Sequence, residues 1–581
     1  MSYKVVLKDA FKGYTLDQDK TVTPQETVKR FREKLKVVDL DILDGTMRID
    51  NGRLDIPVYF SICGRDAEAV IGTKKQMGKG GTTQQSEASA VMELAERFSF
   101  FSFWKDPKNF FVEEYRKIKD HALPLESIVF SVHDDSDELE RALEVFSRLP
   151  LKWTWGYNLT REQEVLIPFN WFFAINEFNG PSAGNCVEEA VLQGICELVE
   201  RHVSSIVSRN RLKTPALDLR SVSDPLVVEM IKKYQNVGVK LYASDFSLDT
   251  GIPSVGVLAY DPSTFPEKSE IVWTAGTTPN PQKALNRALT EVAQLAGDFN
   301  TCSNYVASGL PKFKNLAEAD FVTNPETSVA VSHLPDISNE NIRVEVENCI
   351  SSLSRIGMEV ILVDVTHPKL EIPAFYTIIP GAHFRERAVG TSVGMFSAKL
   401  IAESGDPRWA LKELRMMDEL LPGKYYVKFF LGLSHLNLNE PMKALKYFEQ
   451  ALMLDPKEED IPSIYSYIGL SLKNMEKYKE ALAALEKAES YDSERTDIFN
   501  LMGFCYFKLK EHNLAIQCFR KVLELNPGSA IDYANIASNY RDMGERDKAI
   551  RYYRFALELD PSIDFARDNL LRLEHHDSSN L

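Results

Sequence analysis

Three stretches of this chain place carboxylates, amides and arginines at helical spacing. Residues 93–97 read Glu-Leu-Ala-Glu-Arg, and residues 197–201 read Glu-Leu-Val-Glu-Arg, 104 positions later. At 100° per residue, the polar residues of each stretch cover about one third of a helix, and apolar residues fill most of the remainder. The three polar stripes comprise Ser89, Glu93, Glu96 and Arg97; Glu189, Gln193, Glu197, Glu200 and Arg201; and, within RALTEVAQ, Arg287, Glu291 and Gln294.

The glutamates on these stripes point to metal chemistry. Helices that are apolar over most of their surface are expected to be buried. A buried carboxylate is costly unless it is paired or binds a cation. Glu93, Glu96, Glu197 and Glu200 would repel one another if they converged, and two divalent cations would neutralise them. Oxygen-only ligands suit Mg²⁺, which proteins typically bind together with substrate phosphates.

An arginine accompanies the glutamates on each stripe. Arg97, Arg201 and Arg287 offer the donors that phosphate oxygens favour. For one such helix, a structural salt bridge with a neighbouring element would be the favoured explanation of the pattern. Three helices with the same spacing favour a functional site over that explanation.

The turn before each helix is rich in small residues. These turns read GKGGTT (78–83), NGPSAGN (179–185) and AGTTPN (275–280). We expect them to expose backbone N–H groups near helix N-termini, where anions are favoured. We also expect Asn280 to cap the third helix ahead of Pro281, and Asn185 to form a capping box with Glu188. The sequence contains neither a Walker A loop nor a Gly-x-Gly-x-x-Gly loop after a strand.

The first 400 residues alternate strand-like and helix-like stretches, which indicates an α/β or α+β domain over residues 1–400. Short stretches rich in β-branched residues predict strands at 255–260, 272–276 and 360–365. Apolar periodicity predicts helices at 24–35, 86–103, 186–208, 281–297 and 341–356.

Small residues recur at a fixed period near the C-terminus. Gly432, Gly469, Gly503 and Ala537 are separated by 37, 34 and 34 residues, and the longer first step is attributed to an insertion near residues 457–460. This period resembles that of the tetratricopeptide repeat and predicts an all-α solenoid over residues 408–575. Such solenoids usually bind a peptide or protein on their concave face. The alternative is a solenoid that only braces the rest of the chain or a homodimer.

The composition narrows the class of protein. With 581 residues and a net charge of −16, the chain is expected to form several folded units and to bind no nucleic acid. No apolar run approaches the ~18 residues of a membrane helix, and the start MSYKVVLKDAFKGY lacks a signal-peptide pattern. The seven cysteines include no Cys-x-x-Cys pair. We therefore expect a cytoplasmic protein with reduced thiols and no membrane contact.

The polar stripes and their turns resemble a known family. GKGGTTQQSEASAVMELAERFSFF, NGPSAGNCVEEAVLQGICELVERHV and ALNRALTEVAQ are similar, in this order, to the three nucleotide-binding signatures of the YcaO family. The resemblance extends over about residues 15–390. It implies an unusual ATP-binding fold whose members use ATP to activate a backbone amide of a peptide or protein.

The resemblance also implies roles for individual residues. It implies ATP contacts at Ser89, Arg97, Asn185, Glu189, Gln193, Arg201, Arg287 and Glu291, and two Mg²⁺ ions bound by Glu93, Glu96, Glu197 and Glu200. The segment DKTVTPQETVKRF resembles a further family segment and adds Lys20, Thr27 and Arg30 as phosphate contacts, for which a plain amphipathic helix is the alternative. Lys79 is a candidate without an assigned role.

The implied mechanism is phosphoryl transfer from ATP to an amide oxygen, attack of a nucleophile on the activated carbon, and loss of phosphate. A side chain of the substrate would give an azoline, and an external sulfur source would give a thioamide. Azoline-forming members commonly end in Pro-x-Pro-x-Pro, whereas this chain ends EHHDSSNL. We therefore favour thioamidation or support of protein methylthiolation over peptide cyclodehydration.

Two other functions stay open, and the partners follow from the favoured one. The chain could be an interaction scaffold that binds ATP without turnover, or an ATP-hydrolysing, kinase-like enzyme acting on a small molecule. For the favoured function, the expected partners are a peptide or protein substrate and a modification enzyme recruited by the repeats. A homodimer is a further expectation from the family.

Overall fold

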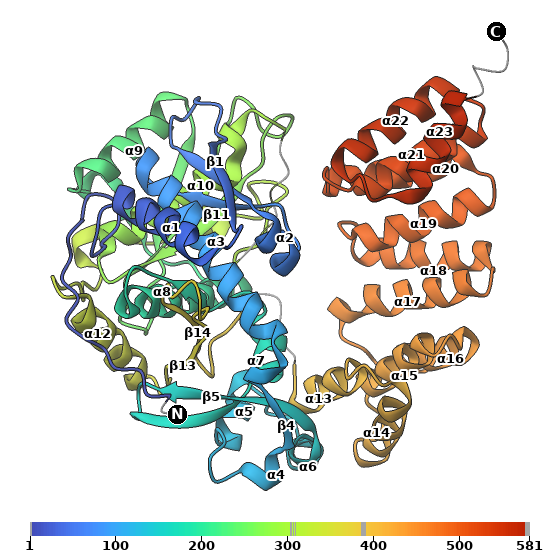
Figure 1. Cartoon of the computed structure of the whole chain (residues 1–581), viewed down its shortest axis with the longest axis horizontal. Coiled ribbons are helices and arrows are strands. Elements are labelled where there is room, and N and C mark those ends of the chain that lie inside the picture. The colour runs from blue at the N-terminus through green and yellow to red at the C-terminus, as the bar shows by residue number, and fades with distance from the viewer. Residues whose placement is uncertain (1–2, 303–304, 306, 308, 385–390, 576–581) are drawn as a thin grey trace. The chain divides into compact units, whose positions relative to one another are not determined.

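The computed structural model describes residues 3–302, 305, 307, 309–384 and 391–575 (Figure 1). The chain forms two compact units. The first comprises Met1–Ser136 and Ser147–Val393, and the second comprises Asp137–Phe146 and Gly394–Leu581. Residues 576–581, which belong to the terminal sequence EHHDSSNL, lie outside the described residues.

The first unit contains three sheets whose strands are almost all antiparallel. The first sheet has the order β1-β2-β3: β1 (Leu43–Arg48), β2 (Val58–Cys63) and β3 (Lys75–Lys79). The second has the order β11-β10-β9-β8-β12: β8 (Ala216–Asp218), β9 (Lys240–Asp245), β10 (Ser254–Tyr260), β11 (Val272–Thr277) and β12 (Ser328–Ala330), with β8 and β12 parallel. The third runs β4-β5-β13-β14-β7, and β6 also pairs with β5: β4 (Phe111–Glu114), β5 (Pro150–Asn158), β6 (Gln163–Pro168), β7 (Pro181–Ala183), β13 (Ile361–Asp364) and β14 (Ala374–Ile378).

The predicted helices and strands of this unit are confirmed. The three strands expected from β-branched residues are β10, β11 and β13. The five expected helices are α1 (Pro24–Val38), α3 (Thr83–Lys105), α8 (Val187–Arg209), α10 (Pro281–Ala296) and α12 (Ile342–Arg355). The other helices of this unit up to residue 323 are α2 (Arg65–Ile71), α4 (Tyr115–Ile118), α5 (Leu125–Val132), α7 (Phe169–Asn176), α9 (Pro225–Asn236) and α11 (Asp320–Thr323), whereas most of α6 (Leu139–Arg148) belongs to the second unit. A mixed fold with antiparallel sheets is the α+β form of the predicted class.

Burial explains why the three striped helices form. The apolar residues of α3 and α8 are buried on most sides, as Val91, Leu94, Ile195 and Leu198 illustrate. Asn280 caps α10 as predicted, because its side chain accepts hydrogen bonds from two backbone N–H groups of the first turn. These helices are therefore stabilised by tertiary packing around a narrow polar stripe.

The second unit is built from stacked helix pairs (Figure 1). The pairs are α15 (Tyr425–Asn437) with α16 (Pro441–Leu452), α17 (Ile461–Asn474) with α18 (Tyr478–Tyr491), α19 (Thr496–Lys508) with α20 (His512–Leu525), and α21 (Ala530–Asp542) with α22 (Arg546–Leu559). The helices α13 (Val393–Ala402) and α14 (Pro407–Leu420) precede the pairs, and α23 (Asp564–His575) follows them. The predicted insertion forms a short 3-10 helix at Glu458–Asp460.

The periodic small residues lie where paired helices touch. A Cβ atom on Gly432 would come within 2.6 Å of the Phe448 ring, and one on Gly503 within 2.8 Å of the Phe519 ring. A larger residue at either position would force the two helices apart. In the described part of the chain, no helix is long and apolar enough to cross a membrane.

Candidate functional site

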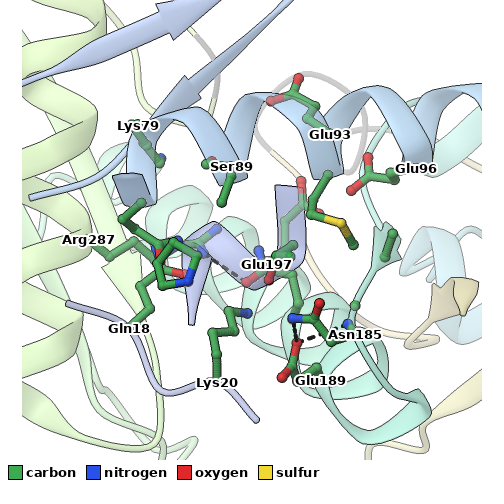
Figure 2. A pocket seen from close by; sticks show the side chains of 18 of the residues that line it. Gln18, Lys20, Lys79, Ser89, Glu93, Glu96, Asn185, Glu189, Glu197 and Arg287 are labelled. Atoms are coloured by element: carbon green, nitrogen blue, oxygen red, sulfur yellow. Dashed lines mark hydrogen bonds between the residues drawn. The ribbon is translucent and has the colours of Figure 1, made fainter. Parts of the chain in front are cut away.

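The polar stripes of α3, α8 and α10 meet at one cavity of about 250 Å³ in the first unit (Figure 2). Strand β3 and residues of the N-terminal segment complete its wall. Figure 2 shows Glu93 and Glu96 along α3, with Glu197, Asn185 and Glu189 carried by the chain around α8. The predicted residues that line the cavity are Lys20, Thr27, Ser89, Glu93, Glu96, Arg97, Asn185, Glu189, Gln193, Glu197, Arg201, Arg287 and Glu291.

Two predicted residues lie elsewhere. Arg30 is exposed on α1, where its Nε donates to Glu26 Oε1 at 2.8 Å. Glu200 is buried behind the cavity wall and accepts hydrogen bonds from Arg287 Nε at 3.0 Å and from the backbone N–H of Thr277 at 3.3 Å. The phosphate role of Arg30 and the metal role of Glu200 stay predictions.

Arg287 is held firmly in the wall of the cavity. Besides its ion pair with Glu200, its Nη1 donates to Gln193 Oε1 at 3.1 Å. Although burial favours the neutral form, the carboxylates of Glu200 and Glu197 outweigh it and raise the pKa of Arg287. The side chain is therefore a fixed cation, ready to accept an anionic ligand without rearrangement.

The carboxyl groups of Glu93, Glu96 and Glu197, which also line the cavity, have few close positive partners. Burial, reinforced by repulsion from Glu197, raises the pKa of Glu93 and raises that of Glu96 further. The nearest arginine contacts are loose, at 3.6 Å from Arg97 Nε to Glu96 Oε1 and 3.9 Å from Arg201 Nη2 to Glu197 Oε1. Such a cluster is expected to gain stability from an added cation.

Glu189 ties the N-terminal segment to α8. Its Oε2 accepts from both the backbone N–H and the Nδ2 of Asn185, at 3.0 and 2.9 Å, and its Oε1 accepts from the N–H and hydroxyl of Thr21 at 2.6 Å. Burial opposes ionisation, but the neighbouring Lys20 and the bonds from Thr21 lower the pKa of Glu189. This arrangement brings Lys20 to the cavity.

The predicted capping box at Asn185 is wrong. Helix α8 begins one residue later, with Cys186 as its N-cap. Glu188, the expected partner of Asn185, instead accepts from the backbone N–H of Lys8 at 2.6 Å. The N-terminal segment therefore competes for the carboxylates of the first turn of α8, which a local capping rule does not consider.

The expectation of free N–H groups in the three turns also needs correction. Before α3, the buried carboxylate of Asp17 accepts from Gly81 N at 2.6 Å and from Thr82 N at 3.2 Å. A carboxyl group of the chain itself thus occupies this helix N-terminus. In the other two turns, the backbone N–H groups of Asn185 and Thr277 donate to the carboxyl groups of Glu189 and Glu200. Four N–H groups of these turns, on Gly81, Thr82, Asn185 and Thr277, thus already donate to carboxyl groups of the chain.

Lys79 completes the cavity wall and was left unassigned by the sequence. It ends β3, lines the cavity and forms an ion pair with Glu291 of α10. Burial and the neighbouring Arg287 lower the pKa of Lys79 to about 7. The position of Lys79 in the sequence GKGG, just before the first polar stripe, was the feature of the sequence that could have assigned it to the site. Asp17 gave no comparable signal, because an aspartate in an N-terminal loop is ordinarily solvated.

The donor set fits Mg²⁺ and phosphate together. Among the described residues, no group of three or more His, Cys, Asp and Glu side chains is close enough to bind a metal alone. Mg²⁺ usually keeps several waters and takes one or two carboxylates plus substrate phosphates, which matches a site of this kind. Within the part of the chain that the structure describes, the buried Nε of Arg201 has no hydrogen-bond partner, so it is available to donate to a phosphate oxygen.

Sequence families match both units. Residues 77–383 match the family described as YcaO cyclodehydratase, ATP- and Mg²⁺-binding. The C-terminal region matches tetratricopeptide-repeat families at residues 425–458, 462–495, 496–529 and 533–563. The repeat matches coincide with the four helix pairs, each of which begins within a few residues of a matched segment.

Individual proteins and a solved structure are also similar to large parts of the chain. An uncharacterized protein of Methanothermobacter thermautotrophicus is 27% identical over 387 residues, which are 62% of this chain and 94% of that protein. The ribosomal protein S12 methylthiotransferase accessory factor YcaO of Escherichia coli is 26% identical over 296 residues, which are 47% of this chain and 48% of that protein. A solved heterocyclase in complex with substrate and cofactor has a TM-score of 0.54 at 22% identity and shares the fold, over 66% of this chain and 55% of that one.

Proposed function

Because the chain belongs to the YcaO family, which binds ATP and Mg²⁺, we propose that it is an ATP-dependent enzyme that activates a backbone amide of a peptide or protein. The observation that supports this most is the meeting of three polar stripes at one buried cavity. Phosphoryl transfer needs mainly positioning and charge neutralisation, and the cavity offers acidic residues for Mg²⁺ and arginines for phosphate oxygens.

In this proposal, the chain's own residues divide the work by charge. Glu93, Glu96, Glu197 and Glu200 bind Mg²⁺, and the phosphates contact Lys20, Thr27, Ser89, Arg97, Asn185, Glu189, Gln193, Arg201, Arg287 and Glu291, directly or through the metal. When bound, Mg·ATP supplies the phosphoryl group that turns the amide oxygen into a leaving group. Arg287, already fixed by Glu200 and Gln193, neutralises developing negative charge without moving. Glu189 keeps Lys20 at the cavity.

The finer reaction that we propose is a sulfur-type modification of a protein, either thioamidation or support of methylthiolation. The likeness to the accessory factor of Escherichia coli supports it, although the chain spans about half the length of that relative. An azoline-forming cyclodehydratase is the alternative. The two differ in the nucleophile, which is external sulfur in one case and a substrate side chain in the other.

We further propose that the repeats recruit the protein substrate or a partner modification enzyme. In this scheme residues 1–400 form the ATP-dependent domain and residues 408–575 form the recruiting domain of a cytoplasmic protein, with homodimerisation as an option. The match of the repeats to tetratricopeptide-repeat families supports a protein-binding role for them.

Phosphate release tests the enzyme proposal against a non-hydrolysing scaffold. The purified chain would be incubated with Mg·ATP and fractionated protein substrates, and phosphate release would be followed together with the mass of each candidate protein. An enzyme gives substrate-stimulated phosphate release and a modified product mass. A scaffold gives ATP-dependent capture of a partner with neither signal. Arg287→Ala should abolish the release while the protein stays folded.

A further inference from the structure

The six-stranded sheet contains a gap beside β5. On one side of β5, its partner β6 runs along the whole stretch from Trp153 to Asn158. On the other side, β4 pairs with β5 only as far as Trp153, and β13 pairs with it only at Tyr157 and Asn158. In the described chain, the residues of β5 between these two ladders have no partner strand on this side. The sheet is thus interrupted in its interior, not at its edge.

The backbone at this gap points into it. Leu159 N–H donates to Val360 O, so odd-numbered residues of β5 direct their N–H and C=O groups toward β13. Trp155 shares this parity and lies between the two ladders. By the same alternation, Asp364 of β13 faces the gap, while Val365 bonds to Ala374 of β14. Backbone donors and acceptors of two strands therefore face one space, the arrangement that takes up an added strand.

A cavity of about 880 Å³ fills this gap, and we call it the wedge cavity. Its wall combines aromatic side chains with hydroxyl groups. The lining residues that matter here are Phe103, Phe111, Trp153, Trp155, Ser99 and Thr366. Ser99 of α3 is fully buried, yet its hydroxyl has no hydrogen-bond partner among the described residues. This hydroxyl is therefore available to a polar atom that enters the cavity.

The chain's own N-terminal segment already uses part of the wedge cavity. Residues 3–6, which belong to no helix or strand, form one side of its wall. The Tyr3 ring stacks on the Trp155 ring with centroids 5.7 Å apart and planes 17° apart, and Tyr3 N–H donates to Glu164 Oε1 at 2.6 Å. Tyr3 is nevertheless 42% exposed, so the contact is shallow. The slot over Trp155 therefore accepts an aromatic side chain from a segment that is not helical.

Two helices, α3 and α8, line both the wedge cavity and the cavity where the three polar stripes meet, which we call the nucleotide cavity. On α3, Glu96 lines the nucleotide cavity and Ser99 lines the wedge cavity. These positions are separated by about 4.5 Å of helix rise. On α8, Glu189 lines the first cavity and Val187 the second. A chain lying in the wedge cavity would thus pass within a few residues' reach of the proposed metal ligands.

We propose that the wedge cavity binds an extended segment of the peptide or protein substrate by adding it as a strand beside β5. An aromatic side chain of this segment takes the slot over Trp155 in place of Tyr3, and its backbone pairs with the N–H and C=O groups that face the gap. Strand addition provides affinity through the main chain, and the aromatic slot provides selectivity. This proposal rests on the proposed amide-activating function and names how that site receives its substrate.

Peptide binding to the full-length protein tests the proposal. The probe is the fluorescent pentapeptide Thr-Val-Tyr-Val-Thr, and its matched control carries N-methyl groups on alternate amides, which removes strand pairing and keeps the side chains. Fluorescence anisotropy should show binding of the unmethylated peptide and at least about tenfold weaker binding of the methylated one. Trp155→Ala should weaken binding of the unmethylated peptide about tenfold, and Tyr3→Ala should strengthen it by vacating the slot. Tyr491→Ala, in the repeats, should leave it unchanged.

The outcomes separate this inference from the proposed function. Mg·ATP binding to each variant would be measured by calorimetry as a fold control. Normal ATP binding with no peptide binding, with equal binding of the two peptides, or with no effect of Tyr3→Ala, would overturn the strand-addition site and leave the ATP-dependent function standing. Peptide binding with the predicted pattern in a protein that does not bind ATP would support the wedge site and contradict the proposed function.

Discussion

Replacing Glu96 by glutamine should stabilise the ligand-free protein and yet remove most of its stabilisation by Mg·ATP. Glu96 is 15% exposed, and its closest arginine nitrogen is 3.6 Å away. Burial, with repulsion from Glu197 and Glu93 added to it, raises the pKa of Glu96 well above its usual value. The carboxylate therefore costs folding energy whenever it is ionised without a cation. Glutamine keeps the shape and removes the charge.

The sign of the pH dependence follows from the raised pKa. A carboxyl group whose pKa is higher in the folded state stabilises the protein below its unfolded pKa of about 4.3, and this contribution is lost as pH rises through the folded value. Near pH 7.5, Glu96→Gln should gain on the order of 1–3 kcal/mol in the free energy of unfolding of the first unit. The gain should shrink as pH falls toward 5. In thermal unfolding it should appear as a rise of a few degrees.

Mg·ATP should stabilise the wild type more than it stabilises Glu96→Gln. A ligand at one hundred times its Kd stabilises a protein by about 2.7 kcal/mol. The wild type should show this increase with Mg·ATP, whereas Glu96→Gln should show little, because it lacks one of the charges of the proposed metal site. Thermal unfolding of both proteins with and without Mg·ATP is the assay, and Glu68→Gln, an exposed glutamate on α2, is the control. Lower ligand-free stability of Glu96→Gln, or equal stabilisation by Mg·ATP, would refute the argument.

Three further predictions concern the cavity and the repeats. Because the pKa of Lys79 is about 7, this side chain loses its charge as pH rises from 6 to 8. Nucleotide affinity should therefore fall over this range in the wild type but not in Lys79→Arg. Calorimetry at several pH values would show the difference. Arg287→Ala should weaken Mg·ATP binding by at least about tenfold. Arg65→Ala should change that binding less than about twofold, because Arg65 is exposed on α2; equal losses would contradict the placement of the site. Gly503→Val should destabilise the repeats by about 1–3 kcal/mol in denaturant unfolding, because its side chain would meet the Phe519 ring, and ATP binding should stay normal.

Local pattern was sufficient to predict the helices and most of the cavity wall. The stripes of α3, α8 and α10 are visible because one helix period relates Glu93 to Arg97 and Glu197 to Arg201, and because the apolar remainder predicts burial. The glycine period of the repeats is visible for a similar reason: helix contacts recur at fixed spacing.

Contacts between distant segments could not be predicted in this way. Asp17 caps the turn before α3 from 64 residues away, and Glu189 accepts from Thr21 across 168 residues. Glu188 was assigned to a cap because local rules ignore the N-terminal segment that binds it. The gap beside β5 depends on where β4 and β13 leave that strand, and strand register across such separations is not encoded in any short stretch.

Calorimetric titration of ATP in the presence and absence of Mg²⁺, on the wild type and on Glu197→Gln, tests the central claim most directly. Glu197 lines the same cavity as Glu93, Glu96 and Arg287. The account predicts Mg²⁺-dependent binding by the wild type, loss of that binding in the variant, and phosphate release only where binding occurs. A folded wild-type protein that binds no ATP, or a variant that binds as tightly as the wild type, would contradict it.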